Sequence, residues 1–167
     1  VGVDGNWTIG ATPADISGWK NGVISVTAAV SDVAGNPATQ ASATLTLDNV
    51  NPDAPVITAI SPDTGSNSAD GITTASSVHV SGTAEAGSTV MLYNGSTLVA
   101  TLTTDGTGHW TTASNITLTS GANALTAIAT DTAGNASATS STFTATLDST
   151  VQRSEEHTSE LQSRETI

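Results

Sequence analysis

The sequence predicts an all-β fold, and three observations lead to this expectation. The 167 residues are rich in Thr, Ser, Ala, Val and Gly, which favour short strands and turns over long helices. Apolar or small residues recur at every second position, most clearly in Ala124–Thr130, as expected for a strand with one buried face. Turn-forming residues separate such segments at regular intervals, and no helical periodicity is present.

Seven short strands are expected in the part of the chain from residue 49 to residue 149. They lie near Pro55–Ile60, Ser77–Gly82, Thr89–Tyr93, Thr97–Thr103, Trp110–Ala113, Ala122–Thr130 and Ser140–Leu147. Asn94-Gly95 is a strong two-residue hairpin signal between the third and fourth of these strands. Seven strands within about one hundred residues are typical of an immunoglobulin-like β-sandwich.

The apolar residues of these strands form the expected core, which is modest and has no Cys pair to support it. Trp110 begins a strand, so a core position is favoured over a surface position that stacks on a ligand. The expected core consists of Val56, Ile60, Val78, Val80, Val90, Leu92, Leu98, Leu102, Trp110, Leu125, Ile128, Phe143 and Leu147.

Two parts of the chain match each other at an offset of about one hundred residues, which indicates tandem modules. Gly22–Asn36 aligns with Ala122–Asn135, and each segment is followed by a strand that ends in Leu-Asp. The segment around Trp7 likewise matches the segment around Trp110. We therefore expect the C-terminal part of a truncated repeat over residues 1–48 and a complete repeat over residues 49–149.

The charge of the chain excludes some classes of partner. The formal net charge is -12, from fifteen acidic residues and three basic ones. Nucleic acid and anionic membrane both require a basic patch, so we expect neither as a partner. Cations suit this surface better. An acidic surface that serves only solubility is the alternative, but the preference for Asp over Glu argues against it as the whole explanation.

Four short motifs together resemble the bacterial Ig-like repeats of giant type I-secreted and biofilm-associated surface adhesins. They are Leu-Asp-Asn-Val-Asn-Pro-Asp-Ala-Pro (47–55), Gly-Thr-Ala-Glu-Ala-Gly (82–87), Asp-Gly-Thr-Gly-His-Trp (105–110) and Asp-Thr-Ala-Gly-Asn (131–135). The resemblance covers residues 1 to about 149. It implies an extracellular rod at the cell surface, built from many modules with calcium at their junctions.

A calcium site is expected at one end of the complete module. Antiparallel strands bring alternate loops to the same end, and the preceding module delivers one further carboxylate there. Close carboxylates repel each other unless a cation neutralises them, and Ca²⁺ takes six to eight oxygen ligands. The expected metal ligands are Asp48, Asp53, Glu85, Asp105 and Asp131. Each Asp could equally serve its own turn, and this alternative stays open. A second, weaker site is expected at the far end, from Asp63, Asp70 and Asp148.

The last residues differ in composition from the rest of the chain. Arg153–Ser163 looks like an in-frame translation of a sequencing-library adapter. We therefore interpret residues 150–167 as a non-native tail, disordered or artefactual, and do not count its His157 as a metal ligand.

The function expected from these features is that of a structural stalk repeat in an extracellular adhesin, with neighbouring repeats as partners. No enzyme is expected, because His79 and His109 lack a Ser or Cys at motif spacing and no phosphate-binding loop is present. Two alternatives stay open: a module that binds carbohydrate or a host protein, and a linker module in a secreted polysaccharide-degrading enzyme. Aromatic residues make up 3% of the chain, which favours the stalk over the binding module.

Overall fold

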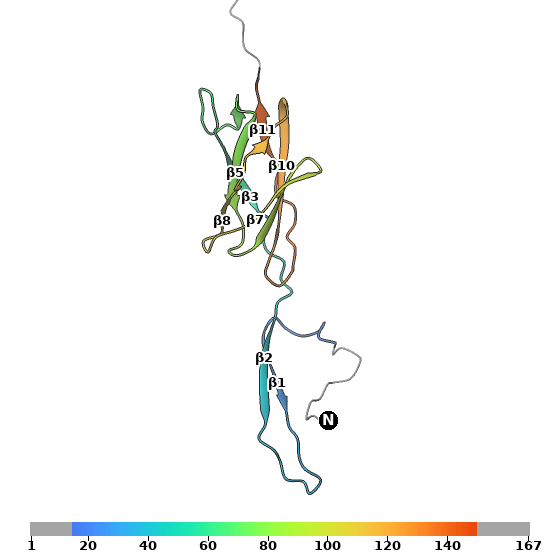
Figure 1. Ribbon diagram of the computed structural model, residues 1–167. Coiled ribbons are helices and arrows are strands. Elements are labelled where there is room, and N and C mark those ends of the chain that lie inside the picture. The colour runs from blue at the N-terminus through green and yellow to red at the C-terminus, as the bar shows by residue number, and fades with distance from the viewer. Residues whose placement is uncertain (1–14, 150–167) are drawn as a thin grey trace, which may run out of the picture. The chain divides into compact units, whose positions relative to one another are not determined.

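The computed structural model describes residues 15–149 (Figure 1). The chain divides into two compact units, with the boundary between Asn51 and Pro52. The expected all-β class is confirmed, because the described residues contain strands and turns but no helix. In this part of the chain, accordingly, no helix could cross a bilayer. The expected tail of residues 150–167 and the match at Trp7 lie outside the described residues.

The first unit contains one β-hairpin. Strands β1 (Gly22–Ala28) and β2 (Ala41–Leu47) pair antiparallel, with Gly22 opposite Leu47 and Ala28 opposite Ala41. Beyond these strands the two arms are joined by the bridge between Ser31 and Pro37.

The second unit is a sandwich of two sheets (Figure 1). The five-stranded sheet has the order β4 (Ile72–Thr73), β11 (Phe143–Leu147), β10 (Gly121–Thr130), β6 (Thr89–Asn94), β7 (Thr97–Thr103). In the other sheet β5 (Ser77–Thr83) is flanked by β3 (Val56–Ser61) on one edge and by β8 (His109–Thr111) and β9 (Ile116–Thr117) on the other. All pairings are antiparallel except that of β4 with β11.

Each of the seven expected segments contains a strand, but residues 52–149 are divided into nine strands rather than seven. The two additional strands are β4 and β9, and each has only two residues. A strand of two residues is too short to produce an alternating pattern, so the sequence did not reveal either of them.

The core lies between the two sheets and is built from side chains of both. Val78 and Val80 of β5 face Leu92 of β6 and Leu125 of β10, and all four are completely buried. Trp110 is 4% exposed, which confirms the core position expected for it.

For three residues the predicted core position was wrong. Val56 and Leu98 are about half exposed, at 55% and 50%, and Ile57 is buried in place of Val56. The cause in both strands is a register shift, between Ile57 and Ala59 in β3 and opposite Leu92 and Tyr93 in β7, which breaks the strict alternation. Ile128 is only partly buried, because its small neighbours in β10 face the core instead.

Candidate functional site

The strand pairings of the second unit bring four of the expected metal ligands to one end of the sandwich. Thr83 at the end of β5 lies opposite both Val56 of β3 and His109 of β8. In the other sheet Thr89 of β6 lies opposite both Thr103 of β7 and Thr130 of β10. The segments next to these residues therefore meet at one end, which we call the acidic end: Asp53, Glu85, Asp105 and Asp131.

Thr104 links two turns of the acidic end by hydrogen bonds, namely the turn between β5 and β6 and the turn between β7 and β8. Its hydroxyl donates to the Glu85 carbonyl at 2.7 Å, and its backbone N–H donates to the Ser88 carbonyl at 3.0 Å. Gly108 accepts a further hydrogen bond from the Ala84 N–H at 2.9 Å. Gly108 has a φ of +81°, and a Cβ there would collide with the Ala84 carbonyl, so this approach of the turns requires glycine. These hydrogen bonds hold the turn after β5 against the turn before β8.

Asp105 holds together its own turn. Its Oδ1 accepts hydrogen bonds from the Thr107 N–H at 2.8 Å, the Thr107 hydroxyl at 2.7 Å and the His109 N–H at 3.0 Å. These bonds stabilise the ionised carboxylate and lower the pKa of Asp105, with the Thr107 hydroxyl as the largest cause. Asp105 therefore has the turn-stabilising role that the sequence left open.

Asp131 has the same kind of role in the turn after β10. Its Oδ1 accepts from the backbone N–H groups of Ala133 and Asn135, each at 2.8 Å, and its Oδ2 accepts from the Asn135 side-chain amide at 2.7 Å. The Asn135 amide is the largest cause of the lowered pKa of Asp131. The Asp-Thr-Ala-Gly-Asn motif is thus explained locally by turn chemistry.

The stability of the second unit is expected to fall when the pH is lowered through the aspartate range. The folded pKa of Asp131 lies below its usual value of 3.8. The contribution of this carboxylate is therefore complete above the unfolded-state pKa and is lost as the pH falls through the folded one. Urea midpoints measured from about pH 6 down to about pH 2 test this. Asp131→Asn should show a shallower pH dependence, and an unchanged slope would contradict the prediction.

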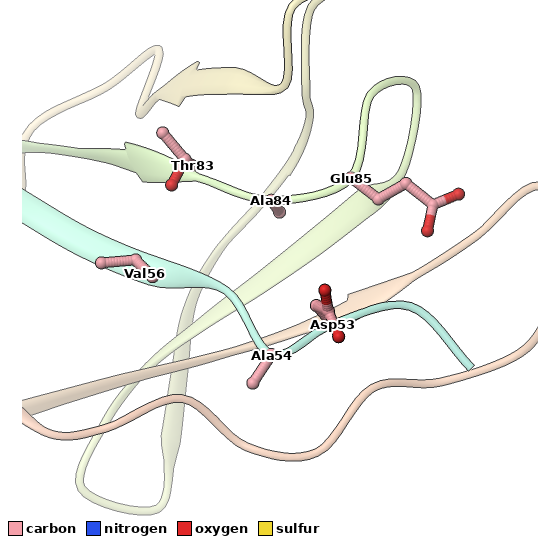
Figure 2. Close-up of a pocket in the computed structure, with 6 residues that line it drawn as sticks. All are labelled: Asp53, Ala54, Val56, Thr83, Ala84 and Glu85. Carbon is pink, nitrogen blue, oxygen red and sulfur yellow. The ribbon is translucent and has the colours of Figure 1, made fainter.

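Asp53 and Glu85 lie on a shared pocket of about 330 Å³, and Figure 2 shows both carboxylates at it. Both side chains are exposed. The pocket is formed where the segment before β3 runs beside the segment after β5, and its lining residues are Asp53, Ala54, Val56, Thr83, Ala84 and Glu85.

Asp48, the fifth expected ligand, belongs to the first unit. Its Oδ1 accepts hydrogen bonds from the Val50 N–H at 3.1 Å and from the Asn21 side-chain amide at 3.4 Å. The Asn21 side chain in turn accepts a hydrogen bond from the Asn49 N–H at 3.1 Å. The Asp48 carboxylate therefore has hydrogen-bond partners within the first unit. Within residues 15–149 no three His, Asp or Glu side chains are placed to hold a metal ion together.

The structure also reveals two polar residues that sequence reasoning missed. Thr104 is 5% exposed and joins the two turns of the acidic end. Asn123 is 2% exposed and connects the loop before β10 with β11 and with the hairpin of β6 and β7. Neither belongs to a recognisable motif. A polar residue at an inward position of an alternating strand was the only signal for Asn123.

Most of the second unit matches a known protein family. Residues 51–149 match the model of the family described as bacterial Ig-like domain. No curated protein matches the chain. Bacterial Ig-like domains commonly occur in surface and extracellular proteins, and the two-layer β-sandwich agrees with the match. The chain therefore belongs to the bacterial Ig-like domain family.

Proposed function

We propose that this chain is part of the stalk of an extracellular bacterial adhesin, in which tandem Ig-like repeats hold a binding region away from the cell and support adhesion or biofilm formation. Calcium rigidifies the junctions between neighbouring repeats, which are the partners of this chain. The proposal extends the family assignment, which by itself indicates a surface or extracellular module.

The observation that carries the proposal is that two hairpins of the chain have the same local geometry. Gly22 lies opposite Leu47 in β1 and β2, and Gly121 lies opposite Leu147 in β10 and β11. The turn that follows each first strand is also the same. Asp32 accepts from the Asn36 N–H at 2.9 Å and from its side-chain amide at 2.8 Å, as Asp131 does from Asn135. This agreement supports two modules in tandem.

The placement of aromatic side chains favours a stalk over a module that binds carbohydrate. Sugar rings are commonly held by exposed aromatic faces. Among residues 15–149, Trp110 is buried, Tyr93 and Phe143 are partly buried, and only Trp19 is largely exposed, at 44%. A single exposed Trp on the first unit is a poor platform for a carbohydrate chain.

The charge of the second unit favours a bound cation. No Lys or Arg occurs between residues 52 and 149, so neither residue type is there to balance Asp53 and Glu85 at their shared pocket. Carboxylate and carbonyl oxygens are the ligands that Ca²⁺ prefers, and Ca²⁺ accepts irregular arrangements of them. Asp53 and Glu85 are thus the best-placed side chains for the ion. Asp105 and Asp131, whose oxygens already serve their turns, would contribute at most a remaining lone pair.

We expect the double substitution Asp53→Asn and Glu85→Gln to weaken calcium binding by about tenfold or more, because two charged ligands become neutral. Isothermal titration of the unmodified chain and of the variant with CaCl₂ measures this. Both side chains are exposed, so folding should be preserved.

The matched control is Asp15→Asn in the first unit, at a residue that belongs to neither expected calcium site. Asp15 accepts from the Ser17 N–H at 2.9 Å, and an Asn side-chain oxygen accepts the same bond. The control should therefore keep the affinity of the acidic end. Equal affinity in the double variant and the unmodified chain would refute the assignment of Asp53 and Glu85.

A further inference from the structure

One face of the hairpin formed by β1 and β2 is apolar and exposed. Val26, Val30 and Leu45 are 41%, 50% and 42% exposed, and their neighbours on the same face are only partly buried. We call this the hairpin face: Ile24, Val26, Ala28, Val30, Leu45 and Leu47. We infer that it is a docking surface for a second β-sheet of the kind that β3, β5 and β8 form in the other unit.

The second unit shows what the same face looks like when it is covered. Aligning Gly22 with Gly121 and Leu47 with Leu147 places Val26 at the position of Leu125 and Leu45 at the position of Ala145. The counterparts of the hairpin face are all buried, with exposures between 0% and 7%: Asn123, Leu125, Ala127, Ala129, Ala145 and Leu147. The hairpin face therefore has the pattern of a core surface.

The chemistry of the occupant follows from what covers the counterpart face. In the second unit β10 and β11 belong to one sheet, and the opposite sheet contributes the buried side chains of Ile60, Val78, Val80 and Trp110. Described residues of the first unit form no such second sheet. The occupant of the hairpin face is therefore a sheet face of branched aliphatic side chains with one Trp.

The occupant should also supply a strand that pairs with the free edge of β1. In the second unit β10 pairs with β11 on one side and with β6 on the other. Among the described residues β1 pairs with β2 alone. Its outer N–H and C=O groups are thus positioned to receive a strand equivalent to β6. Asp32 is the only charged residue between positions 22 and 47 and lies in the turn, so no charge on the face opposes an apolar cover.

One partner supplies both the covering sheet and the pairing strand: an Ig-like module that lacks its last two strands. The inference rests on the proposed tandem modules but is independent of calcium. An Ig-like module supplies the edge strand and the covering sheet together, whereas an isolated extended peptide would supply only the strand.

A chimera tests this inference with a partner taken from the chain's own sequence. In the chimera, a second copy of residues 52–120, which hold β3 to β9, replaces the first 21 residues and is joined directly to Gly22. The junction is conservative because Gly22 and Gly121 both have positive φ, of 125° and 88°. We expect a second cooperative unfolding transition, and amide exchange in β1 slowed by about a hundredfold or more relative to the unmodified chain.

A pair of substitutions in this chimera separates docking from other effects. Val26→Asp lies on the hairpin face and should abolish the second transition. Val23→Asp lies on the opposite face, where Val23 is 74% exposed, and should leave it in place. The inference is overturned if the chimera shows one transition only, or if both substitutions have the same effect. It is also overturned if the unmodified chain sediments as a dimer that Val26→Asp dissociates, since a second copy would then be the occupant. Loss of calcium binding alone would affect only the proposed junction chemistry.

Discussion

Gly82→Ala is expected to destabilise the second unit by about 3 kcal/mol or more, at the upper end of the usual cost of overpacking. Gly82 lies in the middle strand of its sheet, opposite Ile57 of β3 and Trp110 of β8. A Cβ at this position would collide with the Val56 carbonyl oxygen and with Cζ2 of Trp110, and would lie 2.7 Å from Cε2 of the same ring. The carbonyl belongs to the neighbouring strand and the Trp ring is packed in the core, so moving either group away would disturb the sheet or the core packing.

Chemical denaturation of Gly82→Ala and Gly106→Ala provides the matched comparison. Gly106 has no heavy atom within 4 Å of the position that a Cβ would take, and its φ is not in the left-handed region. Its substitution should change the free energy of unfolding by less than about 1 kcal/mol. Similar losses in the two variants would show that the close contact of Gly82 does not limit packing.

Asn123→Leu is expected to cost about 3 kcal/mol or more, although it puts an apolar side chain of similar size into a buried position. The Asn123 amide donates to the carbonyls of Thr119 and Gly121 at 2.8 and 3.0 Å and to that of Ala145 at 3.2 Å. Its oxygen accepts from the Thr119 N–H at 2.9 Å and from the Asn94 amide at 2.9 Å. Leucine would leave these buried groups without their partner.

Asn123→Asp separates the hydrogen-bonding role of this residue from its size. The carboxylate would point one oxygen at three carbonyl oxygens, so the loss of stability should grow as the pH rises above about 4, where an unperturbed Asp ionises. Asn115→Asp changes an exposed residue in the same way and should show little pH dependence. Urea unfolding at several pH values measures both variants. Equal pH profiles would argue against the buried amide cluster.

The sequence predicted strands well where alternation was regular and failed where a local irregularity shifted it. Ala124–Thr130 indicated β10 correctly because every second residue there is inward. In β3 the register shift after Ile57 buries a different residue from the one that strict alternation selects. Such shifts depend on pairing with a neighbouring strand, which a pattern along one segment does not contain.

The sequence predicted which carboxylates share one end of the sandwich, but not the local role of each of them. Antiparallel order alone places Asp53, Glu85, Asp105 and Asp131 at one end. Whether an aspartate binds its own turn depends on backbone torsions that the residue type does not determine. The structure shows this turn role for Asp105 and Asp131 and places Asp53 and Glu85 at a shared pocket.

Thermal unfolding of the chain in millimolar calcium and in excess chelator tests the proposed calcium-stabilised stalk most directly. A control in NaCl of matched ionic strength accounts for the effect that general ionic screening has on a chain with net charge -12. Since a ligand that binds only the folded state raises the melting temperature, we predict a higher Tm in calcium than in either chelator or NaCl. Identical curves in calcium and in NaCl of equal ionic strength would contradict calcium stabilisation and leave the carboxylates with roles in turns and solubility.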